Sequence, residues 1–196
     1  GSYGLINYNI RLQLPKHAFS YEEVGADGYR EHTEMKRRIA SYQTRFKTFS
    51  QGQLNLYLMY SDLNYQTPGA LTLVEYEANP RQARPTVGAT QGAVLANAHI
   101  HQKATLLGVN HRYAFSQKLS NTTSLYGFYN ETENPAIQNY EFKKEPHWGG
   151  RSTFAYSLAD VSIHFGGEFQ QGDFSSETYR NLQGSKGNQL TNDDLD

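Results

Sequence analysis

The chain has 196 residues and a formal net charge of −1, so its charge gives no case for a nucleic-acid partner. It contains no cysteine, which excludes a disulfide framework and cysteine-based metal sites. Mean hydropathy is −0.72, and no run of about 18 apolar residues exists, so the sequence predicts no transmembrane helix. A transmembrane β-strand needs only every second residue to be apolar, so this low hydropathy is compatible with a β-barrel.

The clearest pattern is an alternation of apolar and polar residues near the N-terminus. The apolar set is Ile6, Tyr8, Ile10, Leu12 and Leu14, and the polar set is Asn7, Asn9, Arg11 and Gln13. Because side chains of a strand point alternately to its two faces, this stretch predicts a strand with one apolar face and one polar face.

Further stretches of alternating or aromatic-rich sequence predict more strands. They lie at 19–24, 39–49, 54–61, 107–115, 122–130, 151–158 and 161–170. The predicted connections are short near 15–17, 50–53, 116–118 and 159–160. They are long near 25–37, 62–102 and 131–148, where Gly, Pro and polar residues gather.

Short turns at one end of the strands and long loops at the other are typical of outer-membrane barrels. The predicted strands are also longer than the 5–6 residues usual in soluble sheets. We therefore expect an all-β fold, an antiparallel up-and-down meander of about eight long strands over residues 1–183. Residues 184–196 are polar and acidic, and we expect a polar loop or a disordered tail there.

The alternation has two interpretations. In a soluble sandwich or small closed barrel, the apolar face forms the core and could enclose a small apolar ligand. In a membrane barrel, the apolar face meets lipid and the polar face lines the lumen. Periodicity does not decide between them, but strand length, loop asymmetry and the 15 tyrosines favour the membrane.

Several segments, in order along the chain, resemble TonB-dependent outer-membrane receptors of the iron-complex type. The segment 63–72, followed by 79–85, looks like the region of their third extracellular loop, and Asp27-Gly28-Tyr29-Arg30 resembles a loop entry of that family. Weaker similarities lie at 1–4, 121–127 and 134–141. Each motif alone is weak, but the ordered set covers nearly the whole chain.

The resemblance implies part of the wall of a 22-stranded transmembrane β-barrel in the outer membrane, in contact with its lipid. Such receptors take up a scarce ligand, such as a ferric siderophore, and TonB drives uptake through a plug domain inside the barrel. From the resemblance we expect these residues to contain no counterpart of the plug, the TonB box, the signal peptide or the later strands. We therefore expect the chain to form the early part of the wall.

The long loop predicted at 62–102 is the best candidate for ligand binding. Tyr60, Tyr65 and Tyr76 could contact an aromatic, catecholate-like ligand, and Arg81 and Arg84 could pair with its negative charge. The alternative is that these residues shape the loop and lean on neighbouring loops.

His99 and His101 form a His-x-His pair whose imidazoles share one face of a strand. A metal site needs a third ligand, and none lies nearby in sequence, so the weak metal prediction competes with two solvated histidines. The carboxylates do not combine with a histidine or serine in a recognisable catalytic pattern. The sequence therefore predicts a protein that is not an enzyme and uses no cofactor.

Overall fold

A computed structural model describes residues 1–49 and 51–195, so Ser50 of the predicted 50–53 turn and Asp196 of the predicted tail lie outside the described residues. Two short helices, η1 (Ser2–Gly4) and α1 (Leu73–Ala78), accompany ten strands. The strands are β1 (Ile6–Gln13), β2 (His17–Ala26), β3 (Met35–Thr48), β4 (Gly52–Gln66), β5 (His99–Ala114), β6 (Leu119–Pro135), β7 (Asn139–Ser157), β8 (Ser162–Gly172), β9 (Phe174–Leu182) and β10 (Ser185–Leu195). Among the described residues, no helix is long and apolar enough to cross a membrane.

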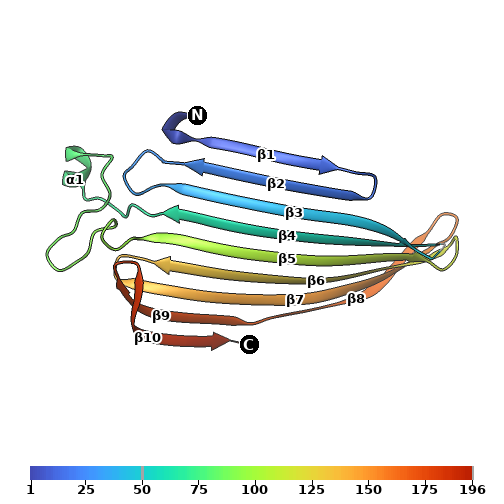
Figure 1. Cartoon of the computed structure of the whole chain (residues 1–196). Coiled ribbons are helices and arrows are strands. Elements are labelled where there is room, and N and C mark those ends of the chain that lie inside the picture. The colour runs from blue at the N-terminus through green and yellow to red at the C-terminus, as the bar shows by residue number, and fades with distance from the viewer. Residues whose placement is uncertain (50, 196) are drawn as a thin grey trace.

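All ten strands belong to one antiparallel sheet, in which strands that are neighbours along the chain pair with each other except β8 and β9 (Figure 1). β8 and β9 both pair with β7, one along each half of it, and they are separated by Asp173. They form one long strand that is interrupted opposite Pro146, whose carbonyl accepts a hydrogen bond from the Asp173 N–H. The predicted all-β, up-and-down meander is confirmed, with ten strands in place of about eight.

Two segments that were predicted as loops are strands. β6 and β7 continue through most of the predicted loop 131–148, and the residues between them are only 136–138. The predicted polar tail 184–196 contains β10, which pairs with β9. The β10 segment is mostly polar, whereas in β7 the residues Tyr140, Phe142 and Trp148 share one face among charged neighbours. The backbone groups of both segments are satisfied by the neighbouring strand, so they need no apolar core to be extended.

Strand register divides the side chains of the sheet into two faces. The apolar face holds the side chains in register with Leu56 of β4, which include Phe19, Val109, Leu125 and Phe165. The polar face holds those in register with its neighbour Asn55. It carries mostly serine, threonine, asparagine, glutamine and arginine. The alternation predicted from the sequence therefore runs consistently across the sheet.

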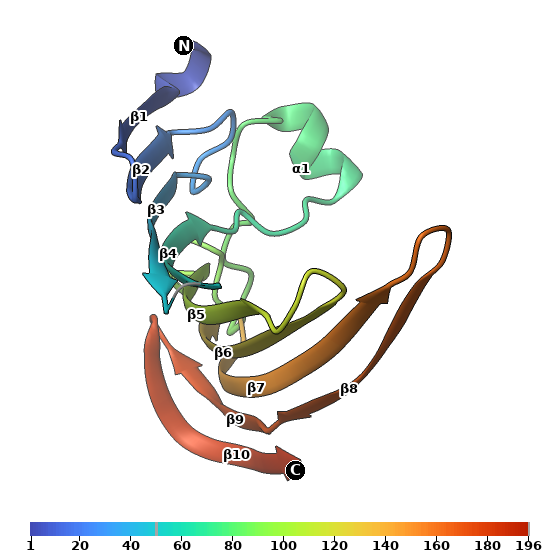
Figure 2. The ribbon, with the colours of Figure 1, turned by 90° about the vertical axis from the view of Figure 1, so that its right-hand side faces the viewer.

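The sheet curls into an open arc, with α1 on its concave side (Figure 2). The concave side opens to the right in Figure 2, so Figure 1 shows the convex side. In Figure 1, β4 runs leftward with β3 above it. On a strand of L-residues that runs leftward, a residue whose side chain points toward the viewer has its backbone N–H directed upward, here toward β3. The Gln66 N–H bonds upward to Glu34 O, so Gln66 and the apolar face in register with it are convex.

Large apolar side chains of the convex face are exposed, among them Ile10 at 62% and Phe165 at 57%. The buried apolar residues in the described structure are small or few, chiefly alanines. β1 pairs only with β2, and β10 only with β9 among named strands, so the described sheet does not close. A closed soluble barrel, the other interpretation of the sequence, would have a packed interior and would pair its first strand with its last. The described residues show neither feature.

Candidate ligand-binding site

The loop between β4 and β5, residues 67–98, is held by the shorter loop between β2 and β3. The Arg30 guanidinium donates to the carbonyls of Gly69 (2.9 Å) and Gln82 (3.0 Å). The Glu31 carboxylate accepts from the Ala83 N–H at 3.2 Å, and the His32 ring lies 2.7 Å from Ala98 O. Because charged groups make stronger hydrogen bonds than neutral ones, this clamp fixes a loop that has little core of its own.

A second attachment joins the far side of the same loop to β9. Asn181, only 3% exposed, donates from Nδ2 to Ala96 O (2.8 Å) and Ala136 O (2.6 Å). The backbone carbonyl of Asn181 accepts a hydrogen bond from Gln91 Nε2 at 3.0 Å. Between the two attachments, Ala83 and Ala93 pack with Ala96 and Ala98 in a small buried cluster. The 67–98 loop is therefore an ordered element at the long-loop end of the strands, attached to the β2–β3 loop on one side and to β9 on the other.

α1 lies within this loop and is stabilised at its N-terminus by a capping box. The Glu75 N–H donates to Thr72 Oγ1, and the Thr72 N–H and hydroxyl both donate to the Glu75 carboxylate, at 2.7 and 2.9 Å. These hydrogen bonds, the backbone one first, hold the pKa of Glu75 below its usual value. A helix of six residues is too short to be stable alone, so the cap defines where it begins.

The structure does not gather the five predicted ligand residues in one place. Tyr60 lies on the convex face, in register with Leu56, and so points away from the concave side. Tyr65 is on the polar face at the loop end of β4, and Tyr76 is exposed on α1. Arg81 lies 5.0 Å from the Tyr29 ring centroid, where cation–π attraction orients it.

Two hollows beside the long loop contain the two arginines. One, of about 630 Å³, includes Asp27, Tyr29 and Arg81. The other, of about 490 Å³, lies between Arg84 and the turn that joins β6 to β7. Arg30 was noticed in the sequence only as part of a motif. Its role as a clamp depends on contacts to residues about 40 and 50 positions away, which no local pattern signals.

His99 and His101 do share one face of β5, as predicted, but each has another partner. His101 Nε2 lies 2.9 Å from Asp62 Oδ1, and His99 Nδ1 lies 2.7 Å from Asn97 O. No group of three metal-ligating side chains occurs among residues 1–49 and 51–195. The pair therefore serves local hydrogen bonding in this structure.

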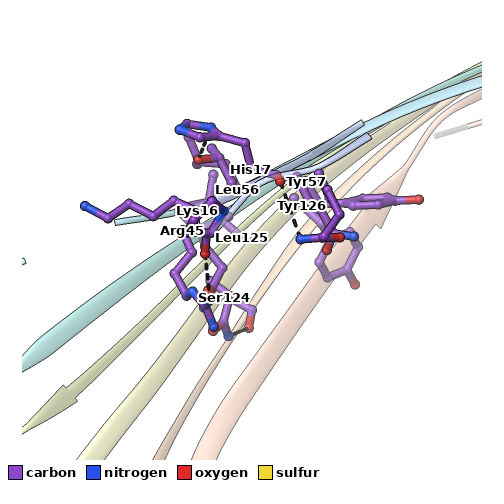
Figure 3. A pocket seen from close by; sticks show the side chains of 17 residues that line it. Lys16, His17, Arg45, Leu56, Tyr57, Ser124, Leu125 and Tyr126 are labelled. Carbon is purple, nitrogen blue, oxygen red and sulfur yellow. Dashed lines mark hydrogen bonds between the residues drawn. The ribbon is translucent and has the colours of Figure 1, made fainter. Parts of the chain in front are cut away.

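A third hollow, of about 470 Å³, lies near the short-turn end of the strands (Figure 3). A hydrogen-bonded row of the polar face crosses it: Asn55 Nδ2 donates to Asn110 Oδ1 (3.3 Å), and Asn110 Nδ2 donates to Ser124 Oγ (2.8 Å). In the next row, Gly108 separates Tyr57 from Tyr126. Sequence reasoning missed this hollow, because only register reveals that a residue without a side chain lies between two tyrosines.

We expect Arg30→Ala to loosen the 67–98 loop without unfolding the sheet. The loss of charge-assisted bonds to Gly69 O and Gln82 O should speed amide hydrogen exchange of the loop by about tenfold to a hundredfold. Arg84→Ala is the control, because within the described structure the Arg84 guanidinium makes no hydrogen bond. Unchanged exchange in Arg30→Ala would show that the clamp does not hold the loop.

Comparison with known protein families finds no match, and neither does comparison with curated proteins. Among solved structures, the fold is similar to the ferric citrate transporter FecA in its unliganded form, with a TM-score of 0.64 and 13% sequence identity. The likeness covers 96% of this chain and 29% of that chain, so this chain spans less than a third of the transporter's length. At this identity the likeness shows the fold, that of a stretch of barrel wall.

Proposed function

We propose that this chain forms part of the outer-membrane wall of a TonB-dependent receptor for an anionic iron complex. The observation that carries the proposal is the pairing of an exposed apolar convex face with a polar concave face. In water, a continuous exposed apolar surface of this kind is unfavourable, whereas lipid around a barrel covers it. The wall-like fold shared with a ferric citrate transporter supports the same function.

In this proposal, TonB acts through a plug domain that the wall encloses, and outer-membrane lipid covers the convex face. The ligand meets the ordered loop end, where Tyr65, Tyr76, Arg81 and Arg84 offer aromatic surface and positive charge. The exposed guanidinium groups of both arginines can each pair a carboxylate through two hydrogen bonds. Tyr60 is left out because it faces the lipid side.

Ferric citrate binding to the chain in lipid vesicles tests this function. We expect the double variant Arg81→Gln with Arg84→Gln to bind ferric citrate at least about tenfold more weakly, because each removes a charge-assisted contact. Lys47→Gln, at the short-turn end of β3, should bind like the unmodified chain. Equal affinity of the double variant and the unmodified chain would remove these arginines from the site, and no binding at all would contradict the proposed ligand class.

A further inference from the structure

The hollow near the short-turn end, here called the Gly108 hollow, is open above its glycine. Tyr57 of β4 and Tyr126 of β6 are in register with Gly108 of β5 on the concave face, one on each side of it. A Cβ atom at Gly108 would have only the Tyr57 Cβ within 4 Å, at 3.9 Å. Tyr126 leans the other way, toward Gly149 of β7. Glycine inside a strand often marks a place where a ligand approaches the backbone closely.

The opening over Gly108 has the size of one planar ring. Neighbouring strands lie about 4.8 Å apart, so the backbones of β4 and β6 are separated by about 10 Å across β5. Once the half-thickness of a tyrosine ring is subtracted on each side, roughly 6–7 Å remain for a ligand. A ring in this space would contact the peptide groups beside Gly108 and the aromatic side chains of Tyr57 and Tyr126.

The lining of the Gly108 hollow is positively charged. It includes Lys16 and Arg45, and no carboxylate from the described part of the chain (Figure 3). The Arg45 guanidinium is exposed and makes a single hydrogen bond, from Nη2 to Pro15 O at 3.1 Å. The two rows of the concave face through Asn55 and Gln53 add charge of the same sign. Their charged members are Arg45, Lys47, Arg112 and Arg151, against one carboxylate, that of Glu168.

The polar row beside Gly108 keeps hydrogen-bond donors free. The side-chain amide of Asn55 donates one N–H to Asn110 Oδ1, and that of Asn110 donates one N–H to Ser124 Oγ. A side-chain amide carries two N–H groups, so each asparagine retains a second donor. These donors and Arg45 all lie on the short-turn side of Gly108. They therefore suit an acceptor with negative charge at that end of the opening.

We propose that the Gly108 hollow binds a small aromatic carboxylate. Its ring lies against Gly108 between Tyr57 and Tyr126, and its carboxylate points toward Arg45, whose forked donors match two carboxylate oxygens. This site is separate from the proposed iron-complex site, because Arg81 and Arg84 lie at the opposite end of the strands. Its geometry involves no lipid, so it does not depend on the membrane position of the sheet.

Fluorine NMR of 4-fluorobenzoate, with the chain in lipid vesicles, tests this site. Gly108→Leu fills the opening and should abolish binding. Arg45→Gln should weaken it about tenfold, because a charge-assisted contact is lost. The matched controls should bind like the unmodified chain. They are Gly167→Leu, at an open glycine of the convex face, and Arg37→Gln, at an arginine of β3 that pairs with Glu22 at 2.8 Å on the concave face.

Normal binding by Gly108→Leu, or equal loss in a control and its site variant, overturns the proposal. Two competitors test the ligand class. Cyclohexanecarboxylate has the charge without the planar ring, and benzamide has the ring without the charge. Each should displace 4-fluorobenzoate at least about fivefold less well than benzoate does. Equal competition by either one contradicts an aromatic carboxylate site.

The loop variant Arg81→Gln with Arg84→Gln separates this site from the proposed iron-complex site. It should bind 4-fluorobenzoate like the unmodified chain while its affinity for ferric citrate falls. Parallel loss of both ligands would mean that 4-fluorobenzoate binds at the loop, which overturns the second site. Absence of 4-fluorobenzoate binding to the unmodified chain overturns the second site and leaves the ferric citrate test unaffected.

Discussion

Leu125→Arg should destabilise the chain in a lipid bilayer by about 2–4 kcal/mol, the cost of a cation near the middle of the membrane. Leu125 belongs to the apolar convex face and is 53% exposed there. The long arginine side chain would have to cross hydrocarbon to reach water. Urea unfolding in vesicles, followed through the fluorescence of Trp148, measures the change in the free energy of unfolding.

Thr122→Arg is the matched control for this substitution. Thr122 lies on the same strand, β6, three residues away, but its side chain is on the polar concave face. A cation there meets water and neighbouring polar groups, so we expect a change of less than about 1 kcal/mol. If the two variants were equally stable, or if Thr122→Arg were the worse, the orientation of the sheet toward lipid would be wrong.

Gly149→Val should destabilise the sheet by about 1–3 kcal/mol through overpacking. On the concave face, Tyr126 of β6 leans over Gly149 of β7, and a Cβ atom at this position would lie 2.6 Å from the Tyr126 hydroxyl and 2.8 Å from the Phe169 carbonyl oxygen. The tyrosine can swing aside, but the backbone oxygen cannot. An aromatic ring that covers a glycine on the neighbouring strand is a known device for fixing strand register.

The same urea titration checks this prediction in two steps. Gly167→Val is the control, because a Cβ at Gly167 has nothing within 4 Å. Adding Tyr126→Ala to Gly149→Val should recover part of the loss, since one of the two collisions disappears. A Gly149→Val chain as stable as Gly167→Val would mean that the close approach of Tyr126 and Gly149 does not occur in the folded protein.

The sequence predicts the strands well where one face is apolar and the other polar. Around Ile10 and Leu56 the alternation is strict, so the two faces can be told apart from the sequence. Toward the long-loop end charged residues occur on both faces, as Arg37 and Arg38 of β3 show. In β7 the alternation persists only in part, because Lys144 interrupts the apolar set of Tyr140 and Phe142. Charged residues and prolines therefore made residues 131–148 resemble a loop, and the mostly polar composition of the β10 segment did the same.

The candidate sites could be predicted only in part. Composition and the Gly- and Pro-containing dipeptides predicted a loop at 62–102, of which residues 67–98 form the loop in the structure, but they did not predict which residues lie together within it. Whether Tyr60 and Tyr65 share a face follows from counting along one strand, and their odd spacing places them on opposite sides. Which side is concave depends on the hand of the whole sheet. The hollow where Gly108 separates Tyr57 from Tyr126 requires the register of three strands, information that a single sequence does not carry.

The two attachments of the 67–98 loop have a mechanical consequence for the arc. One end of the loop is fixed to Arg30, beside β2 and β3, and the other to Asn181 at the end of β9. The loop thus connects the β2–β3 loop with the end of β9, across the strands that lie between them. An isolated antiparallel ribbon can flatten or coil further, and contacts at both ends of this loop restrict that freedom between β2 and β9. The curvature of the arc is in this way fixed in part by contacts within the chain itself.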